Sequence, residues 1–242
     1  EVVFANSGLS YHVAVDRFNQ SFIYWGGASG YSADRRTSLR TVLARDVQIA
    51  DLNRDGNLDL VFAIEGNQDE ESGAWIYWGD GSGNFSERAT IRLPGQRSSA
   101  VAATDLNSDG WPEIVLANRF RLRDQEMGIY NIIDTVAVDS YVYWGSEEGY
   151  LSKERSQLPT VAATDVEAAD LNGDQRRDLV FANGAGGASY IYWASTDGFY
   201  PHKRSALPTS QAAGVAVKDI NQDDYPDLVF AQRGDRLVQD DG

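Results

Sequence analysis

Oxygen-bearing side chains alternate along one stretch of this sequence, between residues 51 and 59. The oxygens come from the backbone carbonyl of Asn57 and from four side chains, Asp51, Asn53, Asp55 and Asp59. A shell made only of oxygen suits a hard cation, and Ca²⁺ is its natural occupant. An EF-hand would continue with a bidentate Glu at the twelfth position and then a helix, but here Phe62 stands in an apolar run. The stretch therefore predicts a calcium loop that joins two strands.

The same pattern recurs three more times in register with the first. With the seventh residue contributing its carbonyl, the predicted ligands are Asp105, Asn107, Asp109, Trp111 and Glu113; Asp170, Asn172, Asp174, Arg176 and Asp178; and Asp219, Asn221, Asp223, Tyr225 and Asp227. Asp, Asn and Gly are also ordinary turn residues, which would explain one such loop without a metal. Four loops in register favour the metal.

Two of the four loops depart from the pattern at the sixth position, where a left-handed backbone is expected. The first two loops have Gly56 and Gly110 there, whereas the later loops have Gln175 and Asp224. Asp tolerates this conformation better than Gln does. The loop 170–178 also places two arginines beside the expected cation, so its metal site is the weakest of the four predictions.

Composition limits the partners of the chain. The 242 residues carry a formal charge of −15 with a pI near 4.4, which argues against nucleic acid or an anionic membrane surface. Four Ca²⁺ ions would add eight positive charges and leave −7, so the loops account for much of the acidity. There is no cysteine, and no apolar run approaches the roughly 20 residues of a membrane span. We expect no direct membrane insertion.

Each loop belongs to a longer repeat with four strand-like runs, which we name a to d in chain order. The loop joins runs a and b, and run c is aromatic, as in residues 21–25, 74–78, 140–144 and 189–193. Short strands, tight turns and no helical periodicity are typical of propeller blades. The sequence predicts an all-β fold, a β-propeller of four-stranded antiparallel blades with Ca²⁺-binding a–b hairpin loops. The repeat boundaries fall near 1–49, 50–103, 104–168, 169–217 and 218–242, in one propeller domain or in a fragment of a larger one.

Length varies in only one place of the repeat. From the Trp of run c to the next loop is 26 or 27 residues, whereas from the first loop Asp to the following Trp is 27, 39 or 23. Antiparallel strands alternate in direction, so the a–b and c–d turns should lie at one end of the blades and the b–c and d–a connections at the other. The variable b–c loops, residues 7–20, 64–73, 119–139 and 184–188, are the predicted binding face.

The runs add up to seventeen strands: b–c–d, three complete units and a final a–b. This is one more than four blades need. We therefore expect that the native ring has more blades than this chain supplies, from a longer parent chain or from a partner. The chain also begins at Glu1 inside a strand-like run, as a piece of a longer protein would.

The loop motif followed by an apolar strand resembles the FG-GAP or VCBS-type repeats of integrin-like β-propellers. The resemblance covers essentially the whole chain. It implies a calcium-stiffened extracellular propeller that acts in adhesion, in carbohydrate or protein recognition, or as a spacer or accessory domain of a larger secreted protein. The ligand, a glycan or a protein, is not implied by it.

An enzyme is not predicted. His12 and His202 are isolated, and no nucleophile elbow, phosphate loop or zinc motif is present. The longest b–c loop carries a cationic and aromatic set that suits an acidic glycan or a carboxylate-bearing peptide: Arg119, Phe120, Arg121, Arg123 and Tyr130. The alternative is that this insertion packs over the ring or meets a neighbouring domain. The tripeptide Arg233-Gly234-Asp235 is interpreted as a chance polar turn.

Overall fold

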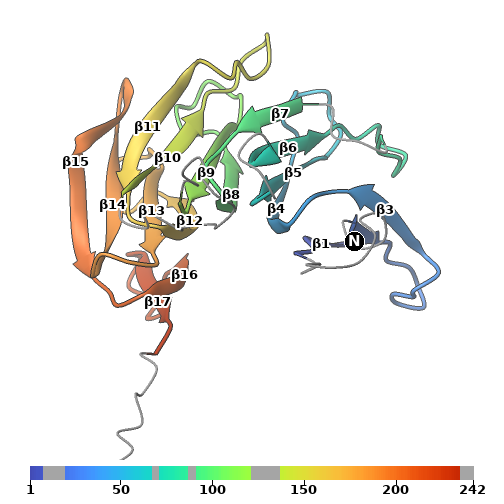
Figure 1. Cartoon of the computed structure of the whole chain (residues 1–242). Coiled ribbons are helices and arrows are strands. Elements are labelled where there is room, and N and C mark those ends of the chain that lie inside the picture. The colour runs from blue at the N-terminus through green and yellow to red at the C-terminus, as the bar shows by residue number, and fades with distance from the viewer. Residues whose placement is uncertain (8–19, 67–70, 87–90, 121–136, 235–242) are drawn as a thin grey trace, which may run out of the picture.

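Figure 1 shows the computed structural model of the chain, which describes residues 1–7, 20–66, 71–86, 91–120 and 137–234. Within these residues the chain forms antiparallel β-strands and no α-helix. The predicted all-β fold of four-stranded antiparallel blades is confirmed. All seventeen predicted strands lie in the described part. In that part of the chain no helix is long and apolar enough to cross a membrane.

The strands form five sheets, three of them complete. Sheet 2 contains β4 (Ala44–Ala50), β5 (Asp59–Ile64), β6 (Gly73–Tyr77) and β7 (Ile91–Pro94). Sheet 3 contains β8 (Ser98–Thr104), β9 (Glu113–Asn118), β10 (Val138–Tyr143) and β11 (Arg155–Thr160). Sheet 4 contains β12 (Ala163–Ala169), β13 (Asp178–Asn183), β14 (Ala188–Ser195) and β15 (Gly198–Pro208).

The two terminal sheets are incomplete. Sheet 1 contains β1 (Val2–Phe4), β2 (Gln20–Tyr24) and β3 (Arg36–Arg40), and so lacks a strand a. Sheet 5 contains only β16 (Ala212–Lys218) and β17 (Asp227–Gln232), strands a and b. Among the described residues no strand of sheet 1 pairs with a strand of sheet 5, so strand pairing does not close a ring.

The b strands of the complete sheets are buried at every position, β5, β9 and β13 alike. Each is a continuous apolar run, as expected for a strand whose sheet is covered on both faces. The tyrosines of the c strands, Tyr77, Tyr143 and Tyr192, are also fully buried. The aromatic rows therefore belong to the core and not to a sugar platform.

Consecutive sheets pack by one rule. We call the face of a sheet that meets the preceding sheet its N-side face, and the face that meets the following sheet its C-side face. In sheet 2 the N-side face, with Leu60, Phe62, Trp75 and Tyr77, packs on Ile23 and Leu39 of sheet 1. The C-side face of sheet 2, with Val61, Ala63, Ala74 and Ile76, packs on Ile114, Leu116, Tyr141 and Tyr143 of sheet 3. Sheets 3 and 4 and sheets 4 and 5 repeat the arrangement.

Buried carboxylates also link neighbouring a strands. Asp46 of β4 accepts a hydrogen bond from the backbone N–H of Val101 at 3.0 Å, and Asp165 of β12 accepts one from Val215 at 2.9 Å. Burial raises the pKa of both carboxyls, and the repulsion from Asp165 adds to the rise at Asp46. The innermost strands are thus joined by polar contacts as well as by packing.

Candidate metal-binding loops and the opposite loop face

The loop between β4 and β5 is shaped by its own side-chain oxygens. Asp51 accepts hydrogen bonds from the backbone N–H groups of Asp55 at 3.1 Å and Gly56 at 3.0 Å. Asn53 accepts from Asp55 at 3.0 Å, and Asp55 accepts from Asn57 at 2.8 Å. Asp and Asn fold loops in this way because their short side chains bond the backbone a few residues on. The oxygens of the first, third and fifth positions therefore turn toward the interior of the loop.

The other three loops repeat this bonding. The first Asp accepts from the backbone N–H of the sixth residue in each: Asp105 from Gly110 at 2.9 Å, Asp170 from Gln175 at 2.8 Å and Asp219 from Asp224 at 2.9 Å. The seventh residues, whose carbonyls are predicted ligands, donate their N–H to the fifth-position Asp, as Trp111 and Tyr225 do at 2.8 and 3.0 Å. The fourfold repeat of the sequence is a fourfold repeat of geometry.

The expected left-handed backbone at the sixth position is confirmed in all four loops. The φ angles are 84° at Gly56, 88° at Gly110, 67° at Gln175 and 69° at Asp224. A residue with a Cβ pays roughly 1 kcal/mol or more for this conformation, so the two later loops hold it against a local preference for negative φ. The hydrogen bond to the first Asp supplies a reason for its retention.

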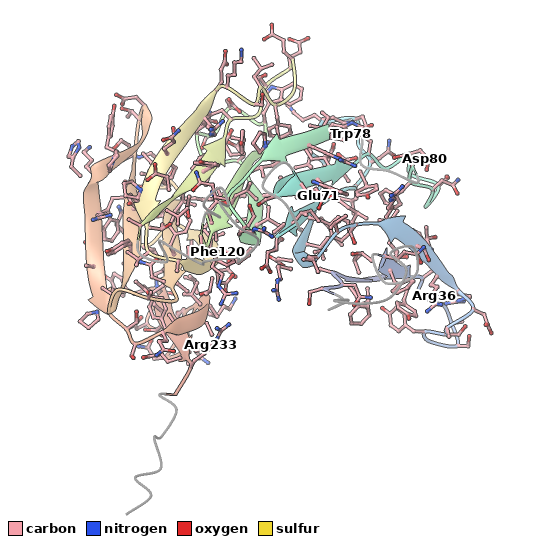
Figure 2. All side chains as sticks on the ribbon, in the orientation of Figure 1. Arg36, Glu71, Trp78, Asp80, Phe120 and Arg233 are labelled. Carbon is pink, nitrogen blue, oxygen red and sulfur yellow. The ribbon has the colours of Figure 1, made fainter. Side chains whose placement is uncertain are left out.

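The ninth-position carboxylates have a structural role that the sequence did not reveal. Asp59 is fully buried, and it accepts one hydrogen bond from Leu52 of its own loop at 2.8 Å and one from Gly79 in the c–d turn at 2.9 Å. Glu113 and Asp178 are equally buried and bond the matching N–H groups. The ninth residue therefore holds the a–b loop and the c–d turn together at one end of the sheet. Figure 2 shows Asp80, in that turn, and Glu71 at opposite ends of β6.

The carboxylates within one loop repel one another. Burial raises the pKa of Asp59, and the charges of Asp55 and Asp51 raise it further, against the two N–H bonds that lower it. Burial and the charges of Asp109 and Asp105 likewise raise the pKa of Glu113 to about 7, although hydrogen bonds from Leu106 and Gly145 oppose them. Crowded carboxylates of this kind are stabilised by a cation placed among them.

The donor set of each loop fits a hard cation in its chemistry. Every predicted side-chain ligand offers oxygen, and a carboxylate oxygen that accepts one N–H bond keeps a further lone pair. In the described part of the chain, however, no three Asp, Glu, His or Cys side chains gather closely enough to form a metal-binding group. The loops thus offer the right ligand types, held by N–H bonds.

The loop 170–178 differs from the others because it contains its own cation. The guanidinium of Arg176 donates to Asp174 at 2.7 Å, and the backbone N–H of Arg176 donates to the other oxygen of Asp174 at 2.9 Å. In the first loop the corresponding oxygen of Asp55 accepts from the side-chain amide of Asn53 at 3.0 Å. Arg176 therefore neutralises the fifth-position charge in this loop.

The opposite end of the sheets carries the b–c connections. The residue that follows each b strand donates its backbone N–H to the end of the preceding d–a connection: Glu65 to Leu43, Arg119 to Gln96, Gly184 to Ala162 and Arg233 to Gln211. Arg119 is half-buried, and Arg45 forms an ion pair with Glu65. Burial and the charges of Arg233 and Arg45 lower the pKa of Arg119, against Glu65, so these side chains share one region.

The predicted ligand-binding residues are placed only in part. Phe120 is half-buried, with the guanidinium of Arg97 6.0 Å from its ring centre, and Figure 2 labels it together with Arg233, which follows β17. Arg121, Arg123 and Tyr130 lie outside the described residues, as do His12 and Asp235. His202 lies on β15 beside Tyr200 and carries no catalytic arrangement among the described side chains that contact it.

Comparison with known proteins agrees with this geometry. The FG-GAP-like repeat family model matches residues 51–116 and 170–230, which together make up just over half of the chain. The chain is also 31% identical over 164 residues to phosphatidylinositol-glycan-specific phospholipase D from Bos taurus, a match that covers 57% of this chain and 18% of that protein. The chain therefore spans less than a fifth of that relative's length. It belongs to the family of FG-GAP-like repeat proteins.

Proposed function

We propose that this chain is a calcium-stabilised, extracellular recognition module without catalytic activity of its own. The observation that carries the proposal is the fourfold loop, in which acceptor oxygens of the first, third, fifth and ninth positions stand together at one end of the sheets. With the seventh carbonyl they would hold Ca²⁺. The cation supplies charge neutralisation among carboxylates that otherwise repel one another.

Calcium binding is tested by thermal unfolding with and without a chelator. We expect a lower melting temperature in chelator, restored by Ca²⁺ and poorly restored by Mg²⁺, which demands a smaller octahedral shell. Asp51→Asn should weaken the calcium-dependent shift. Asp34→Asn, an exposed Asp in sheet 1 outside the loops, is the matched control and should leave it unchanged. A melting temperature that is insensitive to chelator in the wild type would contradict the proposal.

The recognition face is proposed at the opposite end, where the b–c and d–a connections meet. Arg119, Arg233 and Arg45 lie near one another there in an otherwise acidic protein, and guanidinium pairs well with carboxylate or sulfate groups. The proposed ligand is an acidic glycan or a carboxylate-bearing protein segment, bound in adhesion or in recognition.

A glycan array that includes sialylated and sulfated glycans tests this face. Arg119→Ser should abolish binding while leaving the calcium-dependent melting temperature unchanged. Arg36→Ser is the matched control, because Arg36 is an exposed arginine that stacks on Phe22 of sheet 1, away from the b–c connections. Equal binding by both variants would place recognition elsewhere.

A structural spacer or accessory domain of a larger secreted protein is the second candidate. It is favoured by the match to a phospholipase D of which this chain covers only 18%. The two candidates differ in their tests: a spacer depends on Ca²⁺ for stability but shows no loop-dependent binding. Incubation of the chain with a phosphatidylinositol-glycan substrate should give no hydrolysis under either candidate, and hydrolysis would refute the absence of catalysis.

A further inference from the structure

The interfaces between sheets have a repeated aromatic arrangement on the N-side face. In sheet 2, Phe62 and Tyr77 meet edge to face with ring centres 5.7 Å apart, and in sheet 4 Phe181 and Tyr192 do so at 5.9 Å. These four side chains are fully buried by the preceding sheet. An edge-to-face Phe–Tyr pair on this face is therefore the half of an interface that receives a C-side face.

Sheet 1 presents the same half-interface to solvent. Phe4 and Tyr24 form the pair again, with ring centres 5.7 Å apart at 89°, yet Phe4 is 54% exposed. Val2, at the place of the buried Leu60, is 37% exposed. Together with Phe22 and Tyr31 these side chains line an open hollow of about 600 Å³.

Sheet 5 presents the complementary half. Val229 is 49% exposed on its C-side face, whereas the matching Val61, Val115 and Val180 are fully buried. Ile220, the second residue of the last loop, is 60% exposed, whereas the matching Leu52 is 2% exposed and packs on sheet 3. Large exposed apolar groups clustered in this way mark an interaction surface.

We propose that the chain associates with a second copy of itself, the C-side face of sheet 5 in one copy packing on the N-side face of sheet 1 in the next. The partner is a second copy because each chain carries both halves of an interface that it builds four times within itself. The contact is heterologous, since the two surfaces differ, and it runs head to tail.

The experiment blocks each half separately in the full chain, with Ca²⁺ present. Phe4→Arg places a charge on the face of sheet 1, and Val229→Arg places one on the face of sheet 5. Analytical ultracentrifugation from micromolar concentration upward should show concentration-dependent association of the wild type and a monomer for each variant alone. An equimolar mixture of the two variants should form a one-to-one pair, because each retains the face that the other has lost.

The mixture also separates loss of the interface from loss of folding, since a misfolded variant could not pair. Leu151→Arg, at an exposed apolar residue of the c–d turn in sheet 3, is the matched control and should associate as the wild type does. A monomeric wild type, a mixture that fails to pair, or association that survives Val229→Arg but not Phe4→Arg would each overturn the proposal. The last result would mean that two sheet 1 faces pair with each other.

Discussion

Replacing Asp59 by Ala tests the structural role of the ninth loop position apart from its proposed role as a metal ligand. The carboxylate is fully buried and accepts N–H bonds from Leu52 and Gly79, at 2.8 and 2.9 Å. Removing it leaves two backbone donors without an acceptor, one in the a–b loop and one in the c–d turn. We expect the two elements to separate at that end of sheet 2.

The magnitude follows from the two bonds. A hydrogen bond to a charged acceptor contributes about 1.5 to 3 kcal/mol, so two would give about 3 to 6 kcal/mol. The desolvation that raises the pKa of Asp59 offsets part of this gain, because the variant no longer buries a charge. We expect a net loss of about 2 to 4 kcal/mol in the free energy of unfolding.

Asp227 is the matched control, because it occupies the same loop position in sheet 5. It accepts from Ile220 at 2.9 Å, is only half-buried, and its sheet has no c–d turn among the described residues. Asp227→Ala should lower the free energy of unfolding by only about 0.5 to 1.5 kcal/mol.

The assay is urea unfolding of both variants in excess chelator, which removes any contribution from a bound cation. Equal losses for the two variants, or a loss at Asp59 that disappears in chelator, would refute the reasoning. The second result would mean that the carboxylate acts only as a metal ligand.

Three further changes have defined outcomes. Arg176→Ser should raise the affinity of the loop 170–178 for Ca²⁺, measured by calorimetry, because it frees one oxygen of Asp174 from an internal cation, and an unchanged affinity would contradict that explanation. Tyr143→Phe should lower the free energy of unfolding by about 1 kcal/mol, since its buried hydroxyl donates to a carbonyl of the preceding sheet, whereas Tyr24→Phe, with no preceding sheet, should change it little. Asp46 has a folded-state pKa raised above 3.8, so the folded protein binds more protons than the unfolded chain above that pH, and stability falls as pH rises through the folded pKa. Urea unfolding between pH 4 and 7 should therefore show the wild type losing stability relative to Asp46→Ala as pH rises, and a difference that grows in favour of the wild type would refute the assignment.

The strands, the loops and their division between two ends of the sheets could be predicted because they are local. A fixed spacing of Asp, Asn and apolar residues states where a hairpin turns, and antiparallel pairing then decides which turns share an end. The second role of Asp59 could not be predicted, because its partner Gly79 is brought close only by the folded sheet. The same holds for Asp46, which reads as an interruption of an apolar strand until the neighbouring sheet supplies the N–H of Val101.

The successive packing of five sheets has a consequence for how the chain opens. Each internal sheet is buried by one neighbour on either side, so its stability is the sum of its own contribution and two nearest-neighbour couplings, as in a one-dimensional Ising chain. Sheets 1 and 5 have one coupling each. Opening should then begin at the termini and advance inward, and amide hydrogen exchange should be slowest in β9 and faster in β1 and β17. The protein would fray like a short helix, although it contains only strands in the part described.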